Sequence, residues 1–303
     1  MKDLLEALKT RGIAVRENCL LSVYSSFRVG GVARAIAIPD TRERLVDALN
    51  LARASGVRFS VFGNASNVVF ADEGYEGLVI FTGECKSYYL HDGSIYADAG
   101  VSLGKLSMLA CERGLAGGEF LFGIPGTVGG GIFMNAGAFG GSMADICIAS
   151  EFWNSETGEI GRLLGEEHRF SYRTSAYEVH PEWVILGAYF LFGAGDSAEI
   201  RAKMEDYLGR RKTTQPLEYP SAGSVFKRPE GHFAGKLIED CGLKGYTVGG
   251  AQVSQKHAGF IVNVGGATAA DIRALVLHIQ RTVERETGVS LECEIRFVES
   301  GKE

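Results

Sequence analysis

The clearest chemical feature of the sequence is a stretch rich in glycine and almost free of charge. Between Gly114 and Gly141 eleven residues are glycine, and Glu119 is the only charged one. An anion bound here would be held by backbone N–H groups, and glycine turns form such amide nests because they lack side chains. The stretch therefore predicts a site for the pyrophosphate of a dinucleotide. The alternative is a set of tight structural turns, since glycine also serves β-bulges and close packing.

A second candidate for phosphate binding is the segment Gly63-Asn-Ala-Ser-Asn67, which follows a strand predicted to end at Phe62. Its small residues, together with its serine and asparagine side chains, offer hydrogen-bond donors at a strand-to-loop turn. Without the first stretch, an ordinary asparagine-rich turn would explain this segment equally well.

Several common catalytic patterns are missing from the sequence. No G-x-G-x-x-G follows a strand, segments 100–105 and 231–236 fail the Walker pattern, and no G-x-S-x-G supports a hydrolase. The six histidines lack metal-ligand spacing, and the six cysteines form no CxxC pair. We therefore expect neither a metal site nor disulfides.

Charge and hydropathy exclude further classes of function. The net charge is −6, which leaves no basic surface for nucleic acid. No apolar run approaches the ~20 residues of a membrane helix, and Lys2, Asp3 and Glu6 interrupt any signal-peptide core. We therefore expect a cytoplasmic protein of two or three domains, with neither nucleic acid nor membrane as a partner.

The elements that must position these residues are helices and strands in mixed order. Helical spacing and capping residues predict helices over 2–11, from Thr41 to Gly56, over 102–113, around 235–241 and over 268–287, with another beyond the turn cluster 193–196. Strands are predicted over 57–62, 78–82, 95–97, 146–154, 160–164, 168–172, 184–192, 260–264 and 291–298. In the last strand, alternation places Glu292, Glu294 and Arg296 on the face opposite Leu291, Cys293, Ile295 and Phe297.

Five ordered motifs make the chain resemble a known enzyme family. They are GNASNVVFADEG over 63–74, the IPGTVGG and MNAGA run over 124–138, Tyr172-Arg173, PSAGSVFKRP over 220–229, and LECEIR over 291–296. Together they resemble the UDP-N-acetylenolpyruvoylglucosamine reductase (UDP-N-acetylmuramate dehydrogenase) family over nearly the whole chain. The segment between Arg173 and Val184 is too short for the tyrosine-bearing insertion of the longer class, so the chain is similar to the shorter class.

The resemblance implies an α+β protein with an FAD-binding fold of the vanillyl-alcohol-oxidase type and a C-terminal α+β substrate domain. We expect two FAD-binding subdomains at 1–83 and 84–195, and a substrate-binding domain at 196–303. The FAD is expected to be non-covalent. The cofactor-binding residues that the resemblance implies are Gly63, Asn64, Ala65, Ser66, Asn67, Gly123, Ile124, Pro125, Gly126, Thr127, Gly129, Gly130, Asn135, Ala136 and Gly137. The chain departs from the family at Ala65, where glycine is frequent, and at Gly259, where asparagine is common.

The resemblance also implies a mechanism for peptidoglycan precursor synthesis. NADPH would reduce FAD and leave, and the enolpyruvyl sugar nucleotide would then accept the hydride in the same site. Arg173 would stabilise the negative charge left on the substrate, Ser224 would donate the proton, and Glu294 would polarise or relay it. Tyr172, Arg173 and Lys227 would bind the substrate.

Each of these residues also has an ordinary structural explanation. Arg173 could be a surface arginine, Ser224 could end a turn, Glu294 could face solvent, and Lys227 could be an exposed lysine. Two other functions also remain open. One is an oxidase of the same fold, whose flavin is often tethered through histidine or cysteine, although the stretch 114–141 contains neither. The other is a catalytically silent nucleotide-sugar binder. In each case we expect a monomer with small-molecule partners.

Overall fold

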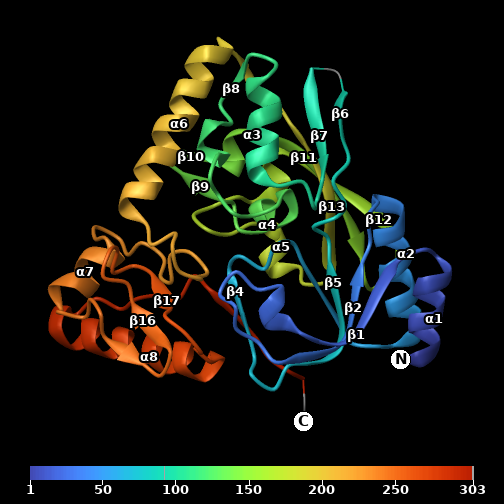
Figure 1. Cartoon of the computed structure of the whole chain (residues 1–303). Helices are drawn as coiled ribbons and strands as arrows, with labels where there is room; N and C mark the ends of the chain where they lie inside the picture. The colour runs from blue at the N-terminus through green and yellow to red at the C-terminus, as the bar shows by residue number, and fades with distance from the viewer. Residues whose placement is uncertain (92, 302–303) are drawn as a thin grey trace. The chain divides into compact units, whose positions relative to one another are not determined.

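The computed structural model describes residues 1–91 and 93–301, and it combines helices and strands throughout (Figure 1). This confirms the expected α+β class. The chain packs as two units. Unit 1 consists of Met1–Glu17, Ala35–Asn64 and Gly77–Arg210, and unit 2 consists of Asn18–Arg34, Ala65–Glu76 and Arg211–Glu303.

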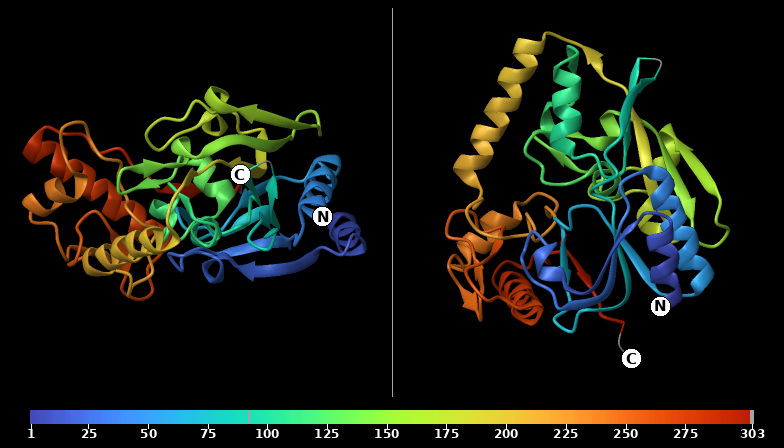
Figure 2. Two further views of the ribbon diagram at one scale, coloured as in Figure 1. Left: turned by 90° about the horizontal axis from the view of Figure 1, so that it is seen from above. Right: turned by 45° about the vertical axis from the view of Figure 1, so that its right-hand side comes forward.

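The N-terminal part of the chain forms two helices and a four-stranded sheet of order β1-β2-β5-β3. The elements are α1 (Lys2–Thr10), β1 (Ala14–Leu20), η1 (Leu21–Val23), β2 (Val32–Ile38), α2 (Arg42–Ser55), β3 (Phe59–Phe62) and β5 (Tyr75–Phe81). As predicted, Thr41 caps α2 by accepting the amide of Arg44, and Gly56 ends it with a left-handed φ of 62°. Helices α1 and α2 pack against each other (Figure 2).

The larger sheet of unit 1 is antiparallel, with the strand order β12-β11-β13-β7-β6. Its strands are β6 (Tyr88–His91), β7 (Ser94–Asp98), β11 (Cys147–Asn154), β12 (Ile160–Leu164) and β13 (Trp183–Phe190). Helices α3 (Leu103–Cys111), α4 (Val128–Phe133) and α5 (Ala176–Val179) accompany it, and α4 packs on β7 and β13. The α4 part of the glycine-rich stretch therefore lies on this sheet.

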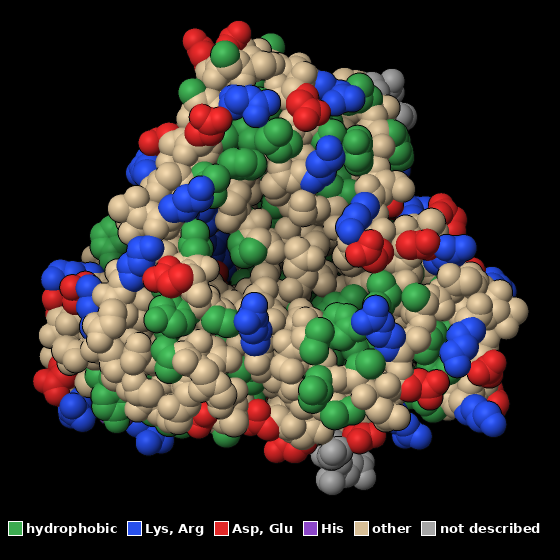
Figure 3. All heavy atoms as spheres, viewed as in Figure 1, with side chains coloured by type: hydrophobic (Ala, Val, Ile, Leu, Met, Phe, Trp, Pro, Cys, Tyr) green, Lys and Arg blue, Asp and Glu red, His purple; other side chains and the backbone are tan. Residues whose placement is uncertain are grey.

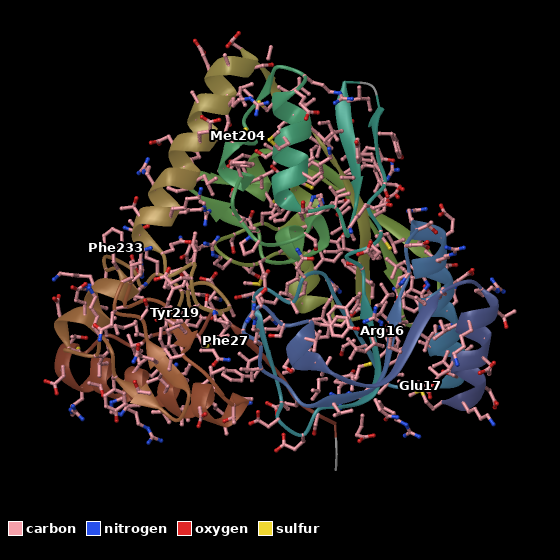
Figure 4. All side chains as sticks on the ribbon, in the orientation of Figure 1. Arg16, Glu17, Phe27, Met204, Tyr219 and Phe233 are labelled. Carbon is pink, nitrogen blue, oxygen red and sulfur yellow. The ribbon has the colours of Figure 1, made fainter. Side chains whose placement is uncertain are left out.

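Short elements connect these larger ones. They are β8 (Leu115–Ala116) paired with β14 (Gly193–Ala194), β9 (Gly137–Ala138) paired with β10 (Gly141–Ser142), η2 (Glu119–Leu121), η3 (Met143–Asp145) and η4 (Gly165–His168). Helix α6 (Ser197–Thr214) begins beyond the predicted turn cluster, and its Met204 (Figure 4) packs with Ile200 and Cys111. The strand predicted over 168–172 is wrong. Arg169 has a left-handed φ of 47°, which ends η4 and prevents an extended run.

Unit 2 is built around a long helix and a small antiparallel sheet, β15-β16-β17. Its elements are β4 (Val68–Phe70), α7 (Ala234–Asp240), β15 (Thr247–Val248), β16 (Ala251–Val253), β17 (Ile261–Asn263), α8 (Ala269–Thr287) and β18 (Arg296–Val298). Helix α8 packs against β15, β16 and α7 (Figure 1). The strand predicted over 291–298 is regular only at Arg296–Val298. The predicted alternation holds in part: Leu291 and Ile295 are buried and Glu292 and Arg296 are exposed, whereas Cys293, Glu294 and Phe297 are all half-buried.

Charged residues of both signs are interspersed over the face shown in Figure 3. Within residues 1–91 and 93–301, no helix has both the length and the apolar character needed to span a bilayer.

The start of α8 is held by an unusual number of hydrogen bonds. Thr268 and Asp271 form the predicted capping box, with both bonds at 3.0 Å. In addition, the carboxylate of Asp72, almost two hundred residues earlier, accepts the amides of Ala269 and Ala270 at 2.7 and 3.0 Å. A negative charge at this end also complements the helix dipole.

We therefore expect Asp72→Ala to lower the free energy of unfolding by about 1 kcal/mol, because two first-turn amides lose their acceptor. Chemical denaturation measures the change. Asp3→Ala, which removes a first-turn acid from α1, is the matched control. An effect no larger than that of the control would show that water replaces Asp72 at no cost.

Candidate functional site

The glycine-rich segment 123–137 is held tightly in unit 1. Leu103 donates its amide to Gly126 O, and the amides of Val128 and Gly129 donate to Val101 O and Ala99 O at 2.8 and 2.9 Å. These bonds fix the entry into α4. They also engage two of the amides that were expected to form an anion nest, so an anion would be held by other donors of the segment.

The segment Gly63-Asn64 docks on residues 125–127 of the same unit. The Asn64 side-chain amide donates to Pro125 O at 3.1 Å. A Cβ added to Gly63 would lie 2.1 Å from Thr127 Oγ1, so only glycine permits this approach.

The hydroxyl of Thr127 lies at the centre of this contact. Thr127 is 1% exposed, and within the described part of the chain its Oγ1 has no hydrogen-bond partner. A buried hydroxyl without a partner costs about 1–3 kcal/mol. The arrangement therefore fits a bound polar group, such as the phosphate or flavin oxygen of FAD, that would satisfy Thr127.

The surroundings of Gly130 also indicate a bound cofactor, because the space beside this glycine is almost empty. It is exposed at the third position of α4, and a Cβ added to it would meet only Thr127 Oγ1, at 3.8 Å, within the described residues. Its φ is not in the left-handed region. Protein packing therefore does not require glycine here, whereas a closely approaching cofactor would.

We expect Gly130→Val to fold normally and to lose most of its FAD, because the added side chain would occupy cofactor space. The measurement is the FAD-to-protein ratio of the purified variant, read from its absorbance spectrum. Gly104→Val is the matched control, since Gly104 is also helical and has no atom within 4 Å of an added Cβ. If Gly130→Val retains full FAD, this surface is not part of the cofactor site.

The second half of the 63–67 motif belongs to unit 2. Ala65 has a left-handed φ of 46°, which explains physically why glycine is frequent at this position. Asn67 Nδ2 donates to Glu294 O at 3.1 Å, and Asn67 O accepts the amide of Arg296 at 3.0 Å. Ser66 lies between Ala65 and Asn67 in the chain. This half of the motif is thus tied to the chain segment that carries Glu294.

Tyr172 and Arg173 form the tip of a tight turn in unit 1. Ser171 and Thr174 close it with reciprocal backbone bonds of 3.1 and 3.2 Å. Arg173 has a left-handed φ of 59°, and its guanidinium lies 5.3 Å from the Tyr172 ring centre. The Tyr172 side chain is exposed, whereas Arg173 is half-buried.

Three side chains bind this turn to the glycine-rich segment. Asn135 Nδ2 donates to Ser171 O at 2.9 Å, Ser175 Oγ donates to Phe133 O at 2.8 Å, and Arg173 Nη2 donates to Gly137 O at 3.2 Å. Arg173 is therefore not an ordinary surface arginine. Asn135 also accepts the amide of Ala144 through Oδ1, so its side chain supports the turn. Neither this role of Asn135 nor Ser175 was predicted, because no local sequence pattern marks them.

Ser224, Lys227 and Glu294 lie on two neighbouring extended segments of unit 2. Val225 donates its amide to Gly259 O and accepts the amide of Glu294, at 2.9 and 2.7 Å. Ser224 is exposed and follows Gly223, whose φ is 77°. Lys227 Nζ lies 2.6 Å from a carboxylate oxygen of Glu292. The backbone segments that carry Ser224 and Glu294 thus lie side by side in unit 2, while Arg173 belongs to unit 1.

Gly259, one of the two departures from the family pattern, has a local explanation. Its amide donates to His257 Nδ1 at 3.0 Å, and an added Cβ would lie 3.0 Å from the His257 ring. Burial lowers the pKa of His257, which favours the neutral imidazole that can accept this bond. Glycine therefore leaves room for the imidazole.

Comparison with known proteins gives consistent results along the chain. A family model described as an FAD binding domain matches residues 33–163. Another, described as the C-terminal domain of UDP-N-acetylenolpyruvoylglucosamine reductase, matches residues 215–298. Curated relatives of that name include one from Caldicellulosiruptor bescii, 43% identical over 96% of this chain and 93% of its own length. Another, from Lactobacillus delbrueckii subsp. bulgaricus, is 44% identical over 96% of this chain and 97% of its own.

A solved structure agrees with these relatives. The crystal structure of UDP-N-acetylenolpyruvylglucosamine reductase from Thermus caldophilus superposes with a TM-score of 0.79 and 37% identity, covering 94% of this chain and 99% of that one.

Proposed function

Because this chain belongs to the UDP-N-acetylenolpyruvoylglucosamine reductase family, we propose that it uses NADPH to reduce the enolpyruvyl group of UDP-N-acetylglucosamine enolpyruvate, forming UDP-N-acetylmuramate. The chain is an FAD-dependent oxidoreductase of peptidoglycan precursor synthesis. Its FAD-binding fold of the vanillyl-alcohol-oxidase type and its C-terminal domain agree with the expectation.

One observation carries the assignment of residues: the turn that bears Arg173 is hydrogen-bonded at three points to the glycine-rich segment. A guanidinium fixed there would lie beside a flavin held by that segment. A permanently charged, planar group with several donors is well suited to a carboxylate whose negative charge increases during reaction.

Bound FAD, reduced beforehand by NADPH, would supply a hydride to the terminal carbon of the enolpyruvyl double bond. The substrate is left with negative charge shared between its carboxylate and the adjacent carbon. Arg173 stabilises that charge through its guanidinium. Ser224 then donates its hydroxyl proton to the adjacent carbon, and Glu294 polarises Ser224 or relays a proton back to it. Two electrons and two hydrogens are thereby added to one double bond.

We propose that FAD and the substrate are bound by different sets of residues. Gly63 to Asn67 and the segment from Gly123 to Gly137 would hold FAD, with the Thr127 hydroxyl among the donors. Tyr172 would contact the substrate through its exposed ring. Lys227 would bind its phosphate or carboxylate, exchanging its present contact with Glu292 for the ligand.

Three subdomains, at 1–83, 84–195 and 196–303, remain our proposal for the organisation of the chain. Three separate clusters of buried residues support the number of subdomains, but the start of α6 packs with the second subdomain, since Ile200 and Met204 cluster with Cys111. One apolar cluster is made mainly by residues 4–85, a second by residues 95–192, and a third mainly by residues 222–295. Phe27, Val29 and Val69 join the third cluster, which accounts for the assignment of 18–34 and 65–76 to unit 2.

Steady-state turnover tests the proposed function. We expect NADPH oxidation that requires the enolpyruvyl substrate and yields an equal amount of UDP-N-acetylmuramate, and slower oxidation of NADH. We also propose a cytoplasmic monomer, which light scattering coupled to gel filtration would check. NADPH oxidation that is independent of the enolpyruvyl substrate, with consumption of oxygen, would instead favour an oxidase.

A further inference from the structure

Unit 1 contains a fully buried polar network that the proposed mechanism does not use. Ser150 Oγ lies 2.7 Å from His168 Nε2 and 2.6 Å from Tyr177 Oη, and His168 Nδ1 lies 2.8 Å from Gly165 O. Ser150 and His168 are 0% exposed, and Tyr177 is 1% exposed. A serine so close to a histidine could suggest a nucleophile and its base, but no substrate could reach this one.

Only one assignment of donors and acceptors is consistent with all the hydrogen bonds of the network. Burial lowers the pKa of His168, so its imidazole is neutral at neutral pH. Its Nδ1–H donates to Gly165 O, which leaves Nε2 as an acceptor for the hydroxyl of Ser150. Ser150 Oγ in turn accepts from Tyr177. Every polar atom of the three side chains is then satisfied, and such a network holds its members rigidly.

The network lies at the base of the turn that carries Arg173. His168 ends η4 and Tyr177 lies in α5, so together they bracket residues 169–176. Ser150 belongs to β11, which pairs with both β12 and β13 in the five-stranded sheet. One serine hydroxyl thus anchors both ends of the loop to the sheet. Phe170 extends the anchor by stacking on His168, with ring centres 4.8 Å apart.

The loop needs such an anchor because its backbone is strained. Arg169 and Arg173 both have left-handed φ values, of 47° and 59°, which non-glycine residues rarely adopt. The three side-chain bonds to the glycine-rich segment hold the loop on one flank, and the buried network holds its two ends.

We infer that Ser150, His168 and Tyr177 are positioning residues that hold the Arg173 turn in its catalytic conformation. The inference rests on the proposed function of Arg173. All three side chains are buried, and they act through the placement of the guanidinium. Small displacements of a group that stabilises developing charge reduce the rate strongly.

Tyr177→Phe tests the inference with the smallest change, since it removes one hydroxyl and keeps the ring. We expect reoxidation of the reduced enzyme by the enolpyruvyl substrate to slow about tenfold. FAD content and the rate of flavin reduction by NADPH should stay at wild-type values. Hydrogen exchange of the peptide 169–176 should become faster. Tyr189→Phe is the control, because its hydroxyl contacts Tyr89 and Arg162 on the same sheet, away from the turn.

A double-mutant cycle separates positioning from general stability. In the Arg173→Ala background, Tyr177→Phe should cause no further slowing of reoxidation. Ser150→Ala, which removes the shared hydroxyl, should reproduce or exceed the effect of Tyr177→Phe.

The inference would be overturned if Tyr177→Phe reoxidised at the wild-type rate. It would also be overturned if Tyr177→Phe slowed reoxidation by the same factor in the Arg173→Ala background as in the wild type. Either result would leave the role of Arg173 intact. Wild-type reoxidation by Arg173→Ala itself would instead refute the proposed role of Arg173, and this inference with it.

Discussion

Ser224→Ala is expected to slow reoxidation of the reduced enzyme by the enolpyruvyl substrate by about 10³-fold, within the range for loss of a general acid. The hydroxyl is the proposed proton donor, and alanine has none. Reduction of the flavin by NADPH needs no proton from this residue and should stay unchanged. Stopped-flow absorbance at the flavin band measures both half-reactions separately.

The structure makes this substitution a clean test. Ser224 is exposed, and its segment is held by backbone bonds through Val225 rather than by the serine side chain. Folding and FAD content should therefore be preserved. Ser221→Ala, three residues earlier, is the matched control and should behave as wild type. Reoxidation of Ser224→Ala at a near-wild-type rate would rule out the proton-donor role.

Arg173→Ala should slow the same half-reaction by about 10²–10³-fold, the usual cost of removing one group that stabilises developing negative charge. It should also weaken substrate binding, because the guanidinium is proposed to hold the substrate carboxylate before reaction. Arg173→Lys should recover only part of the loss, since an ammonium cannot bind a carboxylate in the bidentate manner of arginine. The measurement is the substrate dependence of reoxidation after reduction by NADPH.

Arg169→Ala provides the control for Arg173. Arg169 is exposed, lies in the same loop and has a similar left-handed φ, so its loss tests strain and net charge without the proposed chemistry. It should reoxidise within about twofold of wild type, as is usual for surface positions. Equal slowing by the two substitutions would mean that the loop, and not the Arg173 guanidinium, matters.

The ends of the main helices were predicted well, because a helix-capping residue acts on backbone groups only a few positions away in the sequence. Thr41, Gly56, Thr268 and Gly288 begin or end α2 and α8 as expected. Strands β1 and β2 were missed, since AVRENCL and VARAIAI lack a clear alternation of apolar and polar residues. The strand predicted over 168–172 was wrong because Arg169 has a left-handed backbone conformation, which the residue type arginine does not reveal.

The site could be predicted only through motifs, and its supporting contacts could not be predicted at all. Nothing in the sequence links Asp72 to the start of α8, Ser175 to Phe133, or Ser150 to His168 and Tyr177. Such contacts depend on how distant segments pack. Likewise, the assignment of residues 65–76 to unit 2 follows from the pairing of β4 with β18, which joins residues more than two hundred positions apart.

An anaerobic single-turnover experiment tests the central claim most directly. The oxidised protein is reduced by one equivalent of NADPH in the absence of oxygen, and the enolpyruvyl sugar nucleotide is then added. We expect the flavin absorbance lost on reduction to return at once, with one equivalent of UDP-N-acetylmuramate per flavin. Absorbance that returns only when oxygen is admitted, with the sugar nucleotide unchanged, would contradict the proposed function.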